Sequence, residues 1–254
     1  MPGGAVGSRV TNQDSNESWS VFGAGTYAFT DRLNGRAELR YSDDEKKRHI
    51  PKGMPDGSDA RLKGSWGLLS WRTGLDYHLS DPWMVYGSVA YAEKPGKFDT
   101  GKVGVIVNVG PPAVVQQKLL AVELNPETNL TYEIGAKGTV ADGRLVLATA
   151  AYYTDWKDIV MPRTLVADPE TGLPLDRPVG RDENIGSADV WGIEFESSYK
   201  ISDIWATNLG VSYTKSEFKN TKTASFEAFP SYAPAGDSSG NSLLRQPEWM
   251  ANAG

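Results

Sequence analysis

The 254-residue sequence contains no cysteine and only two histidines. Without cysteine, the chain cannot form a disulfide framework, a thiolate metal site or a cysteine nucleophile. No stretch approaches the ~18 consecutive apolar residues that a membrane-spanning helix needs. Basic residues are fewer than acidic ones, with 26 Lys and Arg against 32 Asp and Glu, and the net charge is −6. That balance argues against nucleic acid as the main partner.

The sequence does contain a regular alternation of short polar turns and long loops. The turns lie at residues 30–32, 80–82, 141–143 and 202–204, and the predicted loops at 42–65, 97–126, 164–186 and 219–246. The segments between them allow strands of roughly 10–12 residues, which cover about 25 Å when tilted by ~45°. Short turns at one end and long loops at the other are the layout of an outer-membrane β-barrel.

Apolar and polar residues alternate along these segments with a period of two, which gives each strand an apolar face and a charged face. Trp71, Leu75 and Leu79 alternate with Arg72 and Asp76. Residues 190–215 repeat the pattern, 33–41 and 131–140 show it more weakly, and 18–29, 83–93 and 144–160 are blurred. Buried charges are costly in a packed core unless they are paired, but they suit a water-filled lumen. We predict an all-β, antiparallel up-and-down transmembrane β-barrel, incomplete, with eight strands and the beginning of a ninth.

Aromatic residues form two groups along the predicted strands. Tyr77, Trp83, Tyr199 and Trp205 lie beside the short turns, while Tyr41, Tyr91, Tyr132, Tyr153 and Tyr213 lie toward the long loops. Two such bands are typical of the girdles at the two membrane interfaces. The alternative is a soluble antiparallel sheet with one solvated face, which would have to cover its apolar rows with a second layer.

Several segments, taken in order, carry a family resemblance. They read LRYSDDEK at 39–46, VYGSVA at 85–90, KPGKF at 94–98, LNPETNLTYEIGAK at 124–137, DGRL at 142–145, AYYTDWKDI at 151–159 and GIEFE at 192–196. They resemble strands and loops of TonB-dependent outer-membrane receptors, in particular the siderophore-receptor-like branch. One departure is Tyr91-Ala92-Glu93, which stands where that branch has a glycine before the lysine.

The resemblance implies a 22-stranded, plugged barrel, of which this chain is well under half. It also implies an N-terminal plug domain and a TonB-coupling segment upstream. We therefore expect a fragment, with a strand-flanking loop at 1–16 and a partial receptor barrel at 17–254. The expected setting is the outer membrane of a Gram-negative bacterium, with membrane lipid, the TonB complex and a small-molecule ligand as partners.

The predicted function is TonB-coupled uptake of a scarce nutrient such as a ferric siderophore or another iron complex. The barrel would be a scaffold and not an enzyme, with no catalytic residue, resident metal or cofactor, and its ligand-binding residues are not identifiable. A plugless structural or adhesive barrel is the alternative. An outer-membrane hydrolase using His78 and Asp76 is a third hypothesis, although His78 lies at a short turn, away from the loops.

Four further features have a structural and a functional interpretation. His49, after the charged run 43–48, is a loop residue or a metal ligand, and residues 168–172 are a turn and lack the ligand spacing of a calcium loop. Residues 101–115 are valine-rich and predict a small hairpin, which would line a ligand path. Glu194 and Glu196 are expected to pair with Lys200 or Arg72 rather than to act in acid–base chemistry.

Overall fold

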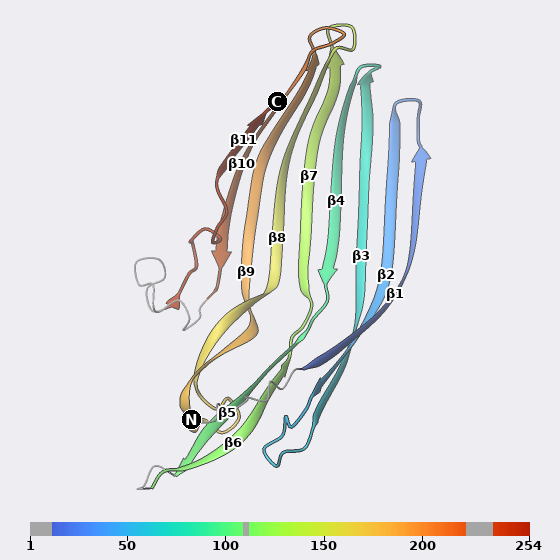
Figure 1. Cartoon of the computed structure of the whole chain (residues 1–254). Coiled ribbons are helices and arrows are strands. Elements are labelled where there is room, and N and C mark those ends of the chain that lie inside the picture. The colour runs from blue at the N-terminus through green and yellow to red at the C-terminus, as the bar shows by residue number, and fades with distance from the viewer. Residues whose placement is uncertain (1–11, 109–111, 222–235) are drawn as a thin grey trace.

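The computed structural model describes residues 12–108, 112–221 and 236–254, and these form a single tall, curved sheet (Figure 1). Nine antiparallel strands make up the wall in the order β1 (Gln13–Ala28), β2 (Leu33–Ile50), β3 (Ala60–Ser80), β4 (Trp83–Lys94), β7 (Glu127–Val140), β8 (Leu145–Ala167), β9 (Pro174–Lys200), β10 (Ala206–Lys219) and β11 (Trp249–Ala253). β5 (Phe98–Asn108) and β6 (Val114–Glu123) form a hairpin between β4 and β7. The predicted all-β, up-and-down, incomplete barrel is confirmed.

The sheet is open, since β1 and β11 each pair with one neighbour within the described residues. No helix in the described ranges is long and apolar enough to cross a membrane. β1 begins at Gln13, earlier than the predicted strand at 18–29. Residues 1–11 of the expected flanking loop at 1–16 lie outside the described residues, and the division at 16/17 stays a prediction.

The four short turns lie where the sequence places them, at one end of the sheet (Figure 1). The turn between β7 and β8 shows how its residues fit. Ala141 and Asp142 have φ of 54° and 55°, and Gly143 follows at 82°. Glycine adopts this left-handed region without the steric cost that a Cβ brings. The Arg144 amide closes the turn on the Ala141 carbonyl at 3.1 Å.

The predicted extents of three long loops are wrong. β2 and β3 run on until only residues 51–59 separate them, and β8 and β9 until only 168–173 do. Residues 98–108 and 114–123 of the predicted loop at 97–126 are strand as well. Backbone pairing extends these strands, and the charged residues of 43–49 pair with 61–67. Residues 60–68 do alternate, with Leu62, Trp66 and Leu68 on the more buried face, out of step with the apolar residues of 71–79. Of the predicted loop at 219–246, residues 222–235 lie outside the described residues.

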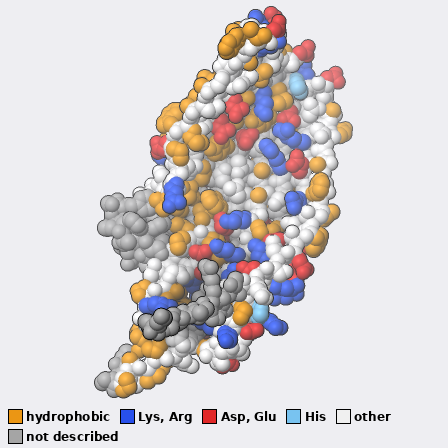
Figure 2. Space-filling view, in the orientation of Figure 1, with side chains coloured by type: hydrophobic (Ala, Val, Ile, Leu, Met, Phe, Trp, Pro, Cys, Tyr) orange, Lys and Arg blue, Asp and Glu red, His pale blue; other side chains and the backbone are white. Residues whose placement is uncertain are grey.

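The two predicted faces are present in the strand register. Leu75 lies opposite Gly35 on β2 and Gly87 on β4, and Gly87 lies opposite Ile134 on β7. These residues belong to what we call the apolar face. Arg72 and its neighbours of even number on β3 belong to the charged face. Figure 2 shows acidic and basic side chains gathered over the middle of the sheet, with hydrophobic side chains along its flanks.

Aromatic side chains form two rows on the apolar face, as predicted. At the loop side, rings contact across strands in the pairs Trp19–Tyr41 (5.6 Å between centroids), Trp71–Tyr91 (6.2 Å), Trp191–Tyr213 (5.6 Å) and Tyr213–Trp249 (4.8 Å). At the turn side, Tyr27 contacts Phe29 at 5.0 Å. Trp83 and Tyr91 bound one strand eight residues apart, which is about 26 Å of extended chain. The rows thus bracket an apolar band.

Candidate functional site in the long hairpins

Three neighbouring hairpins continue the sheet beyond the loop-side aromatic row, and we call them the hairpin wall. It consists of residues 45–65, 95–126 and 157–186, seen at the lower end of Figure 1. The sheet order β3-β4-β7-β8 fixes their arrangement, because it sets the β4–β7 connection between the other two hairpins. The three buried apolar clusters of the described residues include side chains from this wall. The wall is therefore packed structure rather than a set of separate loops.

The first contact joins the β4–β5 connection to the β2–β3 hairpin. Phe98 packs against Trp66, with ring centroids 5.7 Å apart. The Lys46 ammonium lies 5.4 Å from the Trp66 ring centroid and donates to the Gly96 carbonyl at 2.7 Å. Arg48 donates to the Phe98 carbonyl at 3.1 Å. Two cations and an aromatic pair thus hold this segment against β2 and β3.

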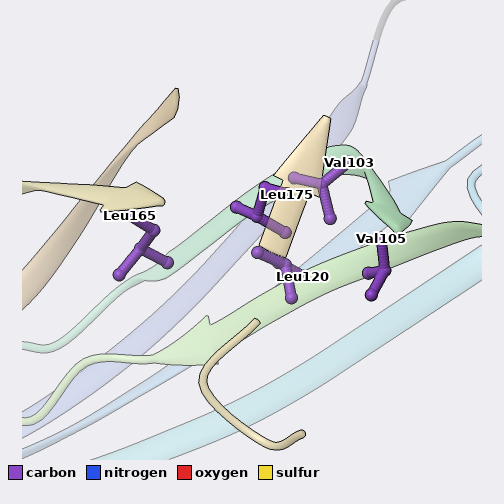
Figure 3. Close-up of a cluster of buried hydrophobic side chains, with 5 residues drawn as sticks. All are labelled: Val103, Val105, Leu120, Leu165 and Leu175. Atoms are coloured by element: carbon purple, nitrogen blue, oxygen red, sulfur yellow. The ribbon is translucent and has the colours of Figure 1, made fainter. Parts of the chain in front are cut away.

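An apolar cluster joins the β5–β6 hairpin to the β8–β9 hairpin (Figure 3). Val103 and Val105 come from β5 and Leu120 from β6, while Leu165 and Leu175 come from β8 and β9. Val103 is 1% exposed, and Val105 pairs directly with Leu175. Full burial of such a side chain contributes about 1.5–3 kcal/mol before entropy costs. The cluster therefore stabilises the docking of the two hairpins.

A buried ion pair lies beside this cluster. Lys118 on β6 donates to both carboxylate oxygens of Asp168, at 2.9 and 3.0 Å, and to Glu170 at 2.8 Å. Asp168 is 1% exposed and also accepts from the Thr171 hydroxyl at 2.7 Å. Burial alone would raise the pKa of Asp168, but Lys118 and Thr171 outweigh it and hold that pKa below its usual value. Residues 168–172 form a turn that Asp168 organises.

Polar contacts extend the same junction along β9. The Lys97 ammonium lies 2.7 Å from an Asp182 carboxylate oxygen, and the Asp182 amide donates to Asp99 at 2.6 Å. The Asn184 side chain accepts from the Asn125 amide at 2.8 Å and donates to the Asp158 carbonyl at 2.8 Å. Asp158 has φ of 55° at an irregularity in β8. Asn184 thus fixes the place where β8 bends.

A second buried carboxylate lies at the base of the wall, on the charged face. Glu127 is 6% exposed and accepts from Lys94 at 2.7 Å and from the Trp156 indole at 3.1 Å. The Lys94 side chain remains 70% exposed. A buried acid, an aromatic edge and an accessible cation therefore lie together where the lumen-side surface meets the hairpins. This cluster is the best-defined candidate for contact with a charged ligand.

The two histidines are far apart in the fold. His49 lies in the β2–β3 hairpin, where its ring nitrogens contact Asp59 at 2.8 Å and Gln13 at 3.3 Å. His78 lies beside the turn to β4, and its neighbour Asp76 is paired with Arg36 at 3.0 Å. Within the described residues, no three His, Asp or Glu side chains are grouped so that they could hold a metal ion. Neither the hydrolase nor the metal-ligand interpretation gains a geometric basis.

The expected ion pair between the paired glutamates and Lys200 is wrong. The Lys200 ammonium binds Asp203 in the adjacent turn at 2.9 Å. Arg72 on β3 donates to the Ser88 hydroxyl on β4 at 3.4 Å. Strands β7 and β8 lie between this contact and the two glutamates on β9. Glu194 and Glu196 are exposed on the charged face. A short turn offers Lys200 a nearer carboxylate, which explains the difference.

Sequence reasoning identified the valine-rich segment but missed its partners. The hairpin predicted at 101–115 is larger, because β6 reaches Glu123, and residues 109–111 lie outside the described residues. The alternation of Val103 and Val105 with small or polar residues was a signal for one buried face. Nothing in the pattern indicated Leu175 or Asp168 as the residues that cover it.

Comparison with known proteins gives a consistent family. A family model described as TonB dependent receptor-like, beta-barrel matches residues 1–254. The pesticin receptor of Yersinia pestis is 26% identical over 213 residues, which is 83% of this chain and 28% of that protein. The catecholate siderophore receptor Fiu of Escherichia coli K12 is 25% identical over 173 residues, or 68% of this chain and 20% of that protein. The chain thus spans 28% or less of these curated relatives.

Two solved structures show the same fold. The ferric yersiniabactin uptake receptor FyuA from Yersinia pestis superposes with a TM-score of 0.64 at 21% identity, covering 95% of this chain and 31% of that chain. The siderophore receptor PiuA from Acinetobacter baumannii gives a TM-score of 0.65 at 20% identity, with the same two coverages of 95% and 31%. At these identities, the likeness establishes the architecture alone.

Proposed function

Since the chain belongs to the TonB dependent receptor-like β-barrel family, we propose that it is part of an outer-membrane receptor for a scarce nutrient. The ligand is a ferric siderophore or another iron complex. The hairpin wall receives this ligand at the cell surface, and passage is driven through the TonB complex. The segment that contacts TonB, and a plug domain inside the barrel, belong to the rest of the receptor. The chain itself supplies wall and mouth, and no reaction.

The observation that carries this proposal is the sidedness of the sheet. Leu75 and Ile193 are 52% and 53% exposed on the apolar face, which suits lipid tails and not water. Charged side chains line the opposite face, which suits a wet lumen. The hairpin wall lies at one end only. The printed names of the relatives, a pesticin receptor and siderophore receptors, support a ligand of this class.

The test uses the full-length receptor that contains this chain, in a bacterial strain lacking its own ferric-siderophore receptors. Uptake of radioactive iron is measured with ferric yersiniabactin and with a ferric catecholate as probes. We expect uptake of at least one probe, lost when TonB is deleted. No uptake of either iron complex, or uptake that persists without TonB, would contradict the proposal.

The cluster at Lys94 offers a sharper test at the mouth. Because its ammonium is largely exposed beside Glu127 and Trp156, we expect Lys94→Gln to weaken the binding of an anionic iron complex by several-fold. KM for uptake should rise while the maximal rate stays unchanged. Lys63→Gln is the matched control, since Lys63 is 63% exposed and pairs with Glu45 on the other face of the hairpin. Equal effects of the two substitutions would exclude the Lys94 cluster.

A further inference from the structure

A groove of about 1100 Å³ lies on the apolar face of the sheet. Its floor follows one row of the register, in which Leu75, Gly87, Ile134 and Ala151 lie opposite one another on β3, β4, β7 and β8. Gly87 and Ala151 are short, whereas the rows on either side include Tyr77 and Tyr153. Two small residues in a row of large ones therefore produce the depression.

The groove is centred between the two aromatic rows. Gly87 is four residues from Trp83 and four from Tyr91, about 13 Å of extended strand in each direction. If the aromatic rows lie at the membrane interfaces, as the proposed function requires, the groove lies in the hydrocarbon layer. We propose that it is a specific seat for one acyl chain of a phospholipid from the periplasmic leaflet.

The charges at the two ends of the groove select this lipid. At the turn end, the groove begins with Leu33, which follows the exposed Arg32 and pairs with Tyr77. The Arg32 carbonyl accepts from the His78 amide at 2.8 Å, which fixes the turn against β3. A guanidinium in this position suits the phosphate of a periplasmic-leaflet lipid, because it can donate two parallel hydrogen bonds.

The loop end of the groove has the opposite character. The next apolar-face row beyond Tyr153 places Tyr91 opposite Leu130 and Leu130 opposite Asp155. The Asp155 carboxylate is paired with Lys157 at 2.9 Å. The Lys157 charge is neutralised by this carboxylate, whereas the Arg32 side chain has no carboxylate partner among the described residues. A phosphate from the outer leaflet is therefore attracted less strongly at this end of the groove than at the Arg32 end.

The experiment titrates the purified full-length receptor in detergent with dioleoyl phosphatidylglycerol or with lipid A. Native mass spectrometry then measures the fraction of receptor that carries a lipid. The substitution Gly87→Leu combined with Ala151→Leu should lower the apparent affinity for phosphatidylglycerol by about tenfold, since the added side chains fill the groove. Arg32→Gln should lower it by several-fold. Lipid A should not compete.

Controls separate this proposal from loss of structure. A Cβ at Gly87 meets no atom closer than 3.9 Å, so a side chain can begin there without a steric clash. Ser197→Leu places a leucine on the apolar face outside the groove and should leave lipid binding unchanged. Unchanged affinity in the groove-filled receptor, or tight lipid A binding that is indifferent to Arg32→Gln, overturns the proposal. Iron uptake tests the proposed function separately, because groove filling should leave uptake intact.

Discussion

At the scale of single residues, the two faces of the sheet impose opposite demands on a new charge. Leu75 lies on the apolar face opposite Gly87, midway between the aromatic rows. We expect Leu75→Arg to reduce the free energy of unfolding of the full-length receptor by roughly 2–4 kcal/mol, because the guanidinium would enter hydrocarbon. Urea titration of the receptor refolded into lipid vesicles measures this loss.

Asn208→Arg is the matched substitution on the charged face of β10. Asn208 lies opposite Ser198 on β9. Its neighbour Leu209 is on the apolar face, so the Asn208 side chain is on the charged face. An arginine there would meet lumen water, so its cost should be much smaller. Equal losses for the two variants would show that the faces are assigned to the wrong environments.

The buried carboxylate of Asp168 gives a residue-scale prediction about pH. Its folded pKa is depressed, so its contribution to stability is present above the unfolded pKa of about 3.9 and is lost as pH falls through the folded pKa. The pKa of Lys118 is raised by Glu170 and Asp168, so that group loses its contribution only at strongly alkaline pH. The docked hairpins should therefore be stable between about pH 5 and 9.

Hydrogen-exchange protection of β6 in the full-length receptor measures this effect. Protection should fall between pH 6 and pH 3. Asp168→Asn should lower protection at pH 6, by about 1–3 kcal/mol, and should reduce the difference between the two pH values. If the variant retains the full pH difference, other carboxylates of the wall control the transition and the role given to Asp168 is wrong.

At the scale of elements, the pairing of β5 with β9 makes the two hairpins one unit. Val105 and Leu175 are partners in this pairing, and antiparallel partners have Cα atoms about 4.5–5.5 Å apart, within the range of a disulfide. The double variant Val105→Cys, Leu175→Cys should form an intramolecular disulfide in the folded receptor. Peptide mass spectrometry after non-reducing digestion detects the cross-link.

The control for this cross-link is Val105→Cys with Val166→Cys. Val166 is 66% exposed and lies outside the apolar cluster. Val166 is adjacent to Leu165, which does belong to that cluster. The control cysteine is therefore close to the docked hairpins but points away from their contact. A comparable yield of both disulfides would mean that β5–β6 samples many positions and does not dock as the structure shows.

The elements also show what a sequence can and cannot reveal. The alternation of Leu75 with Arg72 and Asp76 arises because the two faces of the strand meet different environments. Such a pattern lies within one short segment, so the sequence alone predicts it. Residues 43–49 are charged or histidine and pair with 61–67, where the apolar side chains have changed face: Leu62, Trp66 and Leu68 stand at even positions, whereas Leu75 stands at an odd one. The alternation in 60–68 was therefore out of step with that of 71–79, and the charged partner strand showed none, so both strands were mistaken for loops.

The contacts within the hairpin wall were hidden for a different reason. Lys118 and Asp168 are 50 residues apart and meet only because the β4–β7 connection lies beside the β8–β9 hairpin. Either residue alone resembles an ordinary solvated charge. The same holds for Lys94 and Glu127, whose partnership depends on the register of β4 with β7. Candidate ligand contacts of this kind come from topology and not from local motif.

At the scale of the whole molecule, the sheet formed by the described residues has two free edges, at β1 and β11. All sixteen residues of β1 are exposed. In hydrocarbon, each unpaired backbone group costs several kcal/mol. We expect the 254-residue chain expressed alone to aggregate rather than to insert into lipid vesicles, whereas the full-length receptor should insert and migrate as a heat-modifiable band on a gel. Equal yields of a protease-resistant, heat-modifiable form would mean that the open edges pair with each other or with a second copy.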